Sequence, residues 1–238
     1  MNIGLIGYGK MGKAIENIAT ARGHHIVLKI SSANLYDLTS ANLGECDVAI
    51  EFTHPGCALQ NIRACIDASI PVISGSTGWL KDWNEVKEYV DKKEGSFIYS
   101  SNFSIGVNIF FEVNKKLATL MASRTEYDVS ITETHHTQKK DAPSGTAITI
   151  AEQIIHEISS KGKWVMDGTG NKNELTITSN RMDPAPGTHQ VKYCSPIDDI
   201  DIVHTAHNRD GFATGAVIAA EFLNGKKGIF TMKDVLNI

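Results

Sequence analysis

The sequence predicts a two-domain α/β protein, in which an N-terminal doubly wound parallel sheet is joined to a C-terminal α+β domain with an open mixed sheet. Through residue 103, short apolar runs alternate with stretches of helical periodicity, the pattern of parallel strands joined by right-handed crossovers. Beyond that point apolar residues alternate with polar ones, which is typical of strands with one exposed face. The length of 238 residues suits two domains of modest size.

The N-terminal elements follow from apolar runs and from helical spacing. Residues 2–6 form an apolar run typical of a buried strand. Residues 11–22 place Met11 and Ile15 at helical spacing, and Gly23 stands where a helix C-terminus favours glycine. Further strands are expected at 26–28, 48–50, 71–73 and 97–99, with helices at 58–68 and 83–90.

The C-terminal half is predicted to contain one sheet with its own long helix. A first helix covers roughly residues 106–122, and residues 127–132 alternate with period two, as expected for a half-buried antiparallel strand. A second helix carries Ala151, Ile154 and Ile158 on one face. Strands are expected at 175–178, 190–193 and 200–203, and a last helix at 213–223 that packs on the first domain. The predicted domains are residues 1–103 plus 212–238, and residues 104–211.

Composition and charge argue against several classes of protein. There are 23 Lys and Arg against 27 Asp and Glu, so the net charge of −4 provides no overall attraction to nucleic acid or to an anionic membrane. No apolar run approaches the ~20 residues that span a bilayer, and the N-terminus does not resemble a signal peptide. The four cysteines lack the spacing of a zinc site or a disulfide framework, so we expect no metal and a cytoplasmic location.

A glycine-rich motif lies between the first predicted strand and the first predicted helix. Its residues, which fit G-x-G-x-x-G, are Gly7, Tyr8, Gly9, Lys10, Met11 and Gly12. In that setting Gly7 makes the tight turn, Gly9 lets the backbone approach a pyrophosphate, and Gly12 lets helix and strand pack closely. Free N–H groups at the helix N-terminus would bind the phosphates. The motif predicts a Rossmann-type dinucleotide site, and the alternative is a glycine-rich turn without a ligand.

The segment after the second predicted strand bears on the choice of dinucleotide. A site selective for NAD usually has an Asp or Glu about 20 residues after the motif, where it binds the ribose hydroxyls. Residues 28–34 contain no carboxylate, and Asp37 is the first one that follows. Ser31, a candidate cofactor-binding residue, and Lys29 leave room for a 2′-phosphate. We therefore expect both NADH and NADPH to be used.

A second informative segment, residues 133–146, gathers two histidines, two lysines and a Ser-Gly-Thr run that begins a helix. A helix N-terminus beside ammonium and imidazole groups favours an anion, and a carboxylate substrate is the natural ligand. The alternatives are a solvated lysine pair and solvent-facing histidines. Because the adjacent His135 and His136 would point to opposite faces of a strand, one shared metal ion is disfavoured. Ser144 lacks the surroundings of a catalytic nucleophile, so a capping or anion-binding role is favoured.

At these positions the chain resembles the 4-hydroxy-tetrahydrodipicolinate reductase (dihydrodipicolinate reductase) family of bacterial lysine and diaminopimelate synthesis. The resemblance runs nearly end to end, and its most specific part is the H-H-x-x-K-x-D-A-P-S-G-T-A pattern of residues 135–147. The other matching segments are residues 7–12, Glu51-Phe52-Thr53, Gly75-Ser76-Thr77-Gly78 and residues 100–108. The chain departs from the family in having Lys10 where many members have Arg, Ser76 where Thr is usual, and no acid after the second strand.

The resemblance implies a role for each matching residue. His135 would be the general acid and Lys139 the catalytic or substrate-orienting cation. The substrate carboxylates would be bound by His136, Lys139, Ser144, Gly145 and Thr146. The dinucleotide would lie against residues 7–12 and against Gly75, Ser76, Thr77, Ser100, Ser101, Asn102 and Phe103.

The activity implied by the resemblance is reduction of 4-hydroxy-tetrahydrodipicolinate, a small cyclic dicarboxylate, to tetrahydrodipicolinate with loss of water, using NADH or NADPH. Hydride would reach C4 while electron density moves onto the ring nitrogen. A histidine, which exchanges protons near neutral pH, suits the task of the acid. The family also implies a homotetramer formed through the sheet of the second domain, and the domain arrangement implies a hinge near residues 103–106 and 209–213.

Two alternatives remain open from the sequence. One is another two-domain amino-acid dehydrogenase of the aspartate or homoserine type, which would not need the H-H-x-x-K segment. The other is a nonenzymatic dinucleotide sensor whose second domain is an interaction surface. Binding of pyridine-2,6-dicarboxylate, a planar analogue of the substrate, discriminates between these possibilities, because a sensor or an aspartate-type enzyme should ignore it.

Overall fold

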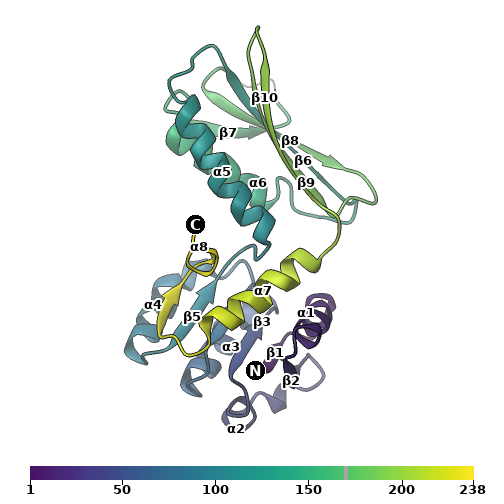
Figure 1. Ribbon diagram of the computed structural model, residues 1–238, viewed down its shortest axis with the longest axis vertical. Coiled ribbons are helices and arrows are strands. Elements are labelled where there is room, and N and C mark those ends of the chain that lie inside the picture. Colours follow the sequence, from purple (N-terminus) through teal and green to yellow (C-terminus); the bar gives the residue numbers. More distant parts are fainter. Residues whose placement is uncertain (169–170) are drawn as a thin grey trace. The chain divides into compact units, whose positions relative to one another are not determined.

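The computed structural model describes residues 1–168 and 171–238. The chain divides into two units, each with its own sheet (Figure 1). The first unit comprises Met1–Ile105 and Arg209–Ile238, and the second unit comprises Gly106–Asn208.

The first unit is built on a six-stranded parallel sheet in the order β11-β5-β4-β3-β1-β2. Its strands are β1 (Asn2–Ile6), β2 (His25–Ile30), β3 (Val48–Glu51), β4 (Val72–Ser74), β5 (Ser96–Tyr99) and β11 (Gly228–Phe230). Its helices are α1 (Lys10–Ala21), α2 (Ser40–Leu43), α3 (Pro55–Asp67), α4 (Trp83–Lys92), α7 (Asp210–Leu223) and α8 (Met232–Leu236), with short 3₁₀ turns at Leu35–Asp37 and Leu80–Asp82. The predicted doubly wound sheet is confirmed, whereas the short edge strand β11 was not predicted.

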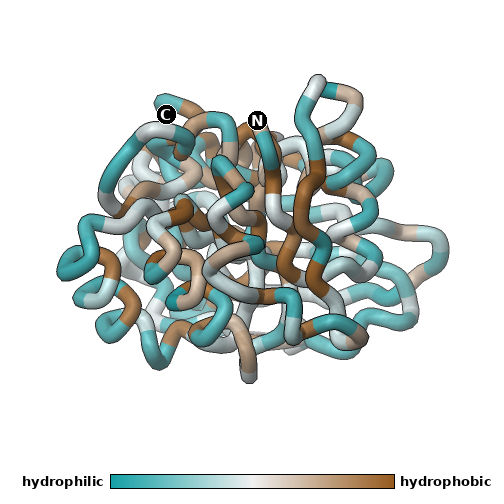
Figure 2. Tube along the Cα trace, turned by 90° about the horizontal axis from the view of Figure 1, so that it is seen from below, coloured by the Kyte–Doolittle hydropathy of each residue, from teal (hydrophilic) through white to brown (hydrophobic). Residues whose placement is uncertain are grey.

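Helices cover both faces of this sheet because the strand side chains alternate between its two sides. On one face Leu5 packs in a core with residues of α1 and α7, among them Ile15 and Ala216. On the other face Ala49 packs with residues of α3 and α4. Figure 2 shows helices at the rim of this unit whose turns alternate between hydrophilic teal and hydrophobic brown. Helix α7 belongs to the first unit, as expected for residues 213–223.

The second unit is built on a five-stranded mixed sheet in the order β10-β9-β6-β8-β7. Its strands are β6 (Asp128–His135), β7 (Lys163–Met166), β8 (Glu174–Arg181), β9 (Gly187–Cys194) and β10 (Asp199–Ala206). The helices α5 (Ile105–Met121) and α6 (Gly145–Glu157) pack on one face of this sheet, in a core that includes Ile131, Ile150 and Ile177.

The central strand β6 is longer than predicted and has a different neighbour on each side. It pairs antiparallel with β9 and parallel with β8. The antiparallel pairing expected for the strand at 127–132 is confirmed on the side of β9. The parallel pairing with β8 was not predicted, and it arises because the chain passes through α6 and β7 before it returns as β8. Strand β7 was not predicted from the sequence. The mixed sheet itself is confirmed, and with it the α/β fold class.

Candidate active site

The glycine loop has the geometry that a dinucleotide requires. Gly7 has a φ of +101°, and a Cβ at this position would lie 2.0 Å from the carbonyl oxygen of Phe52. A Cβ on Gly12 would lie 2.4 Å from the carbonyl oxygen of Gly7, so only glycine allows this packing of α1. Apart from the chain neighbours of Gly9, no described residue has an atom within 4 Å of where a Cβ on Gly9 would lie, and none caps the N-terminus of α1 with its side chain. The loop is thus shaped by close backbone contacts on one side and open on the other, as the pyrophosphate of a dinucleotide needs.

A buried glutamate organises the loops at the carboxyl ends of the neighbouring strands. Glu51 is fully buried at the end of β3, where its carboxylate accepts hydrogen bonds from the hydroxyls of Ser74 (2.6 Å) and Ser76 (2.7 Å) and from the backbone N–H of Thr53 (3.1 Å). A Cβ on Gly75 would lie 2.2 Å from the ring of Phe52. These contacts fix the loop that begins at Gly75 beside the glycine loop.

The remaining predicted cofactor residues lie in loops of the first unit. Thr77 and Ser101 are exposed, whereas Asn102 and Phe103 are buried. The hydroxyl of Ser100 donates a hydrogen bond of 2.7 Å to the carbonyl oxygen of Asn102. Because β1, β4 and β5 are parallel, the loops after them share one edge of the sheet, the edge at which such folds bind nucleotides.

In the second unit, strand pairing brings four side chains of the helix-covered face together. Glu133 and His135 are both buried near the end of β6, two residues apart and therefore on one face. Opposite Glu133 stand Ser179 on β8 and His189 on β9. We call Glu133, His135 and His189 the histidine–carboxylate cluster.

The Glu133 carboxylate is fully buried, and its two oxygens have different surroundings. Oε1 accepts hydrogen bonds from the Ser144 backbone N–H (3.1 Å), the Ser179 hydroxyl (2.9 Å) and Nη2 of Arg181 (3.2 Å). Oε2 makes no hydrogen bond to a described residue but lies 3.2 Å from Nδ1 of His135. Burial alone would raise the pKa of Glu133, but the contacts with His135, Ser144 and Ser179 outweigh it and hold the pKa well below its ordinary value. Glu133 is therefore a fixed negative charge beside the imidazole of His135.

His189 is the neutral member of the cluster. Burial and, after it, the neighbouring His135 lower its pKa to about 3, although Glu133 acts in the opposite direction. Its Nε2 lies 3.9 Å from Oε2 of Glu133 and 3.2 Å from the hydroxyl of Ser144, and its ring meets that of His135 edge-on at 5.1 Å. At physiological pH the cluster thus holds an anionic carboxylate and a neutral imidazole around His135.

The geometry of the cluster would also permit a metal ion, because one ligand atom from each residue lies within 4.8 Å of the others. The Arg181 guanidinium, however, already neutralises Glu133 from the other oxygen. The absence of a bound metal therefore stays a prediction from the sequence.

Lys139 forms an ion pair with Asp141, a contact that was not predicted from the sequence. Its ammonium lies 2.8 Å from both oxygens of the Asp141 carboxylate, and its side chain is 22% exposed. Arg181 Nη2 donates a hydrogen bond of 2.6 Å to the carbonyl oxygen of Asp141, which ties this segment to the cluster. Lys140, by contrast, is exposed.

The Ser-Gly-Thr run lies where the sequence predicted, at the start of α6. The Ser144 hydroxyl accepts a hydrogen bond from the Ala147 backbone N–H (3.2 Å), so the predicted capping role is confirmed. A Cβ on Gly145 would meet nothing within 4 Å, which leaves the first turn open, and Thr146 follows in that turn. His136 is half-buried outside the cluster, and its Nδ1 has no hydrogen-bond partner among the described residues.

Four residues of this site were given no role from the sequence: Glu133, Asp141, Arg181 and His189. Glu133 carried a signal, because its spacing of two from His135 places both on one strand face. Arg181 and His189 carried none, because strand register between distant segments is not encoded in local spacing.

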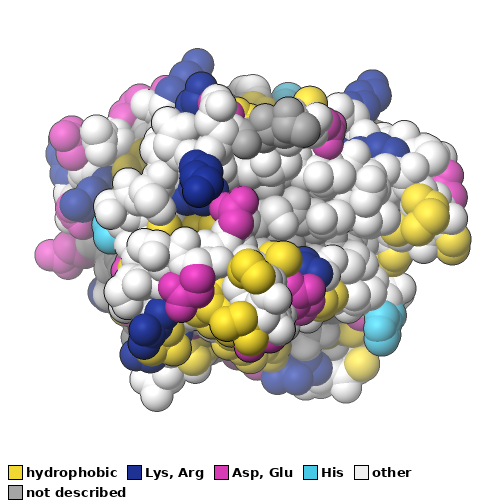
Figure 3. Space-filling view, turned by 90° about the horizontal axis from the view of Figure 1, so that it is seen from above, with side chains coloured by type: hydrophobic (Ala, Val, Ile, Leu, Met, Phe, Trp, Pro, Cys, Tyr) yellow, Lys and Arg dark blue, Asp and Glu magenta, His cyan; other side chains and the backbone are white. Residues whose placement is uncertain are grey.

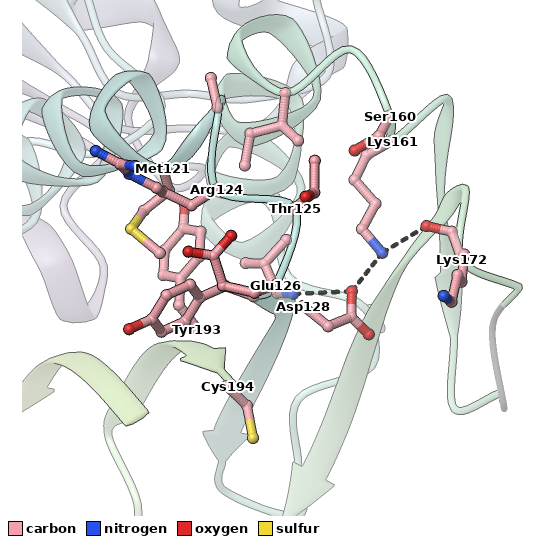
Figure 4. A pocket seen from close by; sticks show the side chains of 14 residues that line it. Met121, Arg124, Thr125, Glu126, Asp128, Ser160, Lys161, Lys172, Tyr193 and Cys194 are labelled. Atoms are coloured by element: carbon pink, nitrogen blue, oxygen red, sulfur yellow. Dashed lines mark hydrogen bonds and ion pairs between the residues drawn. The ribbon is translucent and has the colours of Figure 1, made fainter. Parts of the chain in front are cut away.

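A separate pocket of about 420 Å³ lies at the opposite end of β6, roughly 23 Å along the strand from His135. Figure 4 shows Lys161 in it, whose ammonium donates to Asp128 (2.6 Å) and to the carbonyl oxygen of Lys172 (2.9 Å). Among the described residues that line this pocket, none is a predicted site residue.

On the face seen in Figure 3, Lys and Arg are interspersed with Asp and Glu. In the part of the chain that the structure describes, no helix is long and apolar enough to cross a membrane.

Comparison with known proteins adds independent support. Residues 1–103 match the family model "Dihydrodipicolinate reductase, N-terminus", and residues 106–236 match "Dihydrodipicolinate reductase, C-terminus". A 4-hydroxy-tetrahydrodipicolinate reductase of Christiangramia forsetii is 50% identical over 239 residues, which cover 100% of this chain and 98% of that protein. One from Alkaliphilus oremlandii is 32% identical, covering 97% of this chain and 95% of that protein.

Solved structures share the fold. A dipicolinate-bound dihydrodipicolinate reductase from Paenisporosarcina sp. TG-14 matches with a TM-score of 0.77 at 22% identity, covering 97% of each chain. An amine dehydrogenase from Mycobacterium smegmatis matches with a TM-score of 0.64 at 11% identity, covering 98% of this chain and 95% of that one. The predicted reductase activity in lysine and diaminopimelate synthesis, and the use of NADH or NADPH, are confirmed by the sequence relatives. The chain belongs to the dihydrodipicolinate reductase family.

Proposed function

We propose that this chain reduces 4-hydroxy-tetrahydrodipicolinate to tetrahydrodipicolinate, with loss of water, through the histidine–carboxylate cluster and the adjoining N-terminus of α6. In this proposal the first unit binds NADH or NADPH and the second unit binds the dicarboxylate. The observation that carries the assignment is the buried Glu133 carboxylate, which contacts both the proposed acid, His135, and the backbone N–H of Ser144 at the proposed anion site.

The start of α6 binds the substrate carboxylates. The helix has 13 residues, so its N-terminus carries a partial positive charge that favours an anion. Gly145 leaves the first turn open, Thr146 follows it directly, and His136 is the residue after His135 in the same segment, residues 135–147. Lys139 supplies the full positive charge: its ammonium exchanges part of its contact with Asp141 for a substrate carboxylate.

His135 protonates the nitrogen of the reduced ring. To act as the acid, His135 carries a proton on both ring nitrogens: Nδ1–H faces the Glu133 carboxylate, and Nε2–H gives its proton to the substrate. Gly187 keeps this approach free, because a Cβ there would lie 3.1 Å from Nε2. The neutral His189 contacts the Ser144 hydroxyl and adds no competing positive charge beside the acid.

The dinucleotide, when bound, supplies the hydride. The protein positions the substrate and the dinucleotide and neutralises the charges of the substrate carboxylates. The glycine loop receives the pyrophosphate, and the loops at Gly75 and Ser100 line the edge of the sheet where the rest of the cofactor lies. Glu51 keeps these loops in place through Ser74 and Ser76.

An assay of nucleotide oxidation with freshly generated substrate tests the proposal. We expect turnover with both NADH and NADPH, and inhibition by pyridine-2,6-dicarboxylate that is competitive with the substrate. Nucleotide binding without any turnover would favour a sensor, and turnover that ignores the inhibitor would favour an aspartate-type dehydrogenase. Either result would refute the proposed substrate site.

The proposed assembly is a homotetramer through the face of the second sheet that α5 and α6 leave uncovered. Its supporting observation is that exposed residues alternate along β10, including Val203 at 55% exposure, with no helix of the unit packed over them. Sedimentation should report a tetramer, and a monomer at working concentration would contradict this.

The proposed location is the cytoplasm, since all four cysteines are free, as a reducing compartment keeps them.

A further inference from the structure

Three side chains from three different elements meet beside the glycine loop. Lys29, the penultimate residue of β2, places its ammonium 2.6 Å from Oε1 of Glu16 on α1. The Tyr8 hydroxyl donates a hydrogen bond to the other carboxylate oxygen of Glu16. The Lys29 ammonium also lies 5.1 Å from the centre of the Tyr8 ring. The hydrogen bonds with Lys29 and Tyr8 lower the pKa of Glu16, so this carboxylate is ionised at neutral pH.

The position of this ion pair matters because the carboxyl end of the second strand is where folds of this type recognise the adenosine ribose. The loop that follows the strand is held by Asn34. Its side-chain oxygen accepts from the backbone N–H of Ser31 (2.8 Å), and its side-chain nitrogen donates to the Lys29 carbonyl oxygen and to Asp37 (2.9 Å each). Residues 31–34 thus offer hydroxyl and amide groups but no charge of their own. The acidic group paired with Lys29 comes from α1 instead.

We propose that Glu16 sets the balance between NADH and NADPH, an inference that rests on the dinucleotide site proposed above. This chain lacks an acid at the end of the second strand, and the Glu16 carboxylate disfavours NADPH in its place. It does so because it neutralises Lys29 and repels a 2′-phosphate. NADPH binds when Lys29 exchanges the Glu16 carboxylate for the 2′-phosphate. NADH needs no such exchange.

The exchange is feasible because both partners are reachable. The Lys29 side chain is 41% exposed and that of Glu16 is 24% exposed, so the pair is weakened by solvent. A phosphate monoester carries up to two charges and three acceptor oxygens, which makes it a stronger partner for an ammonium than a single carboxylate. Glu16 therefore lowers the affinity for NADPH without excluding it, as the predicted use of both nucleotides requires.

The test measures nucleotide affinity by calorimetry in the absence of the imine substrate. In Glu16→Gln, NADPH should bind about fivefold more tightly relative to NADH at low salt, and this gain should shrink at high ionic strength. In Lys29→Gln, the affinity for NADPH should fall while the affinity for NADH changes little. The control is Glu85→Gln, which breaks a more exposed ion pair with Arg63 in the same unit and should leave both affinities unchanged.

An equal change of both affinities in Glu16→Gln would mean that the ion pair only holds α1 against β2, and it would overturn the inference. So would a Lys29→Gln variant that loses NADH as strongly as NADPH, a result that remains decisive if Glu16→Gln does not fold. Turnover of the imine by the native enzyme is measured separately. Absence of turnover refutes the proposed substrate chemistry but leaves the ratio of the two affinities readable.

Discussion

Replacing Glu133 by Gln removes the charge of the cluster while keeping its volume. In the native protein three donors converge on Oε1, from Ser144, Ser179 and Arg181. A hydrogen bond to a charged group contributes ~1.5–3 kcal/mol and a neutral one ~0.5–1.5 kcal/mol, so each of the three contacts weakens by ~1 kcal/mol. Because contacts in one network are not additive and Arg181 is 20% exposed, we expect the free energy of unfolding to fall by about 2–3 kcal/mol at pH 7.

The loss should depend on pH with a definite sign. The pKa of Glu133 is held below its ordinary value of 4.5, so its charge stabilises the folded protein above that pH. This stabilisation is lost as the pH falls below 4.5 toward the folded-state value. Urea unfolding measures the difference in the free energy of unfolding between the native protein and Glu133→Gln. This difference should have its largest value at pH 7 and should become smaller below pH 4.5.

Catalysis provides the second measurement for the same variant. Without the carboxylate against Nδ1, the His135 ring loses the contact that orients it, and kcat should fall by about 10- to 100-fold, less than the ~10²–10⁴-fold expected for removal of the acid itself. Glu174→Gln is a matched control, since Glu174 lies on β8 and pairs with the exposed Lys163. If Glu133→Gln resembles this control in both stability and kcat, the assigned role of the cluster is wrong.

The other expected outcomes concern the neighbouring residues. His135→Ala should lower kcat by ~10²–10⁴-fold while calorimetry shows unchanged nucleotide affinity; an unaltered kcat would move the acid elsewhere. Lys139→Ala should cost ~2–5 kcal/mol in kcat/KM and weaken pyridine-2,6-dicarboxylate binding, whereas the exposed Lys140→Ala should cost under ~1 kcal/mol; equal losses would indicate a diffuse basic patch. Because the pKa of His189 lies at about 3 in the folded protein, below its ordinary value of 6.5, the free energy of unfolding falls as the pH drops from 6.5 toward 3. Urea unfolding of His189→Gln between pH 6.5 and 4.5 should show a weaker pH dependence, and an unchanged slope would contradict the buried neutral imidazole.

The sequence was informative where structure depends on local spacing. Apolar runs located the central strands of the first sheet, and the glycine motif located the loop whose close contacts at Gly7 and Gly12 the structure shows. The short strand β11 was missed because three residues carry too little periodicity to register. The partners of Glu133 were missed for a different reason: Ser179 and His189 lie 46 and 56 positions away along the chain, and only strand register brings them to this carboxylate.

The two units share one structural feature, a buried glutamate that holds neighbouring loops. Each has a fully buried glutamate near the end of a strand, Glu51 in the first and Glu133 in the second, that accepts hydrogen bonds from the loops identified by the motifs. The Ser76 hydroxyl donates to Glu51, and the Ser144 hydroxyl is engaged by the Ala147 N–H and His189. These two hydroxyls therefore help to hold the loops in place. Because serine and threonine offer Glu51 the same hydroxyl, Ser76 in place of the usual threonine preserves the contact that this position requires.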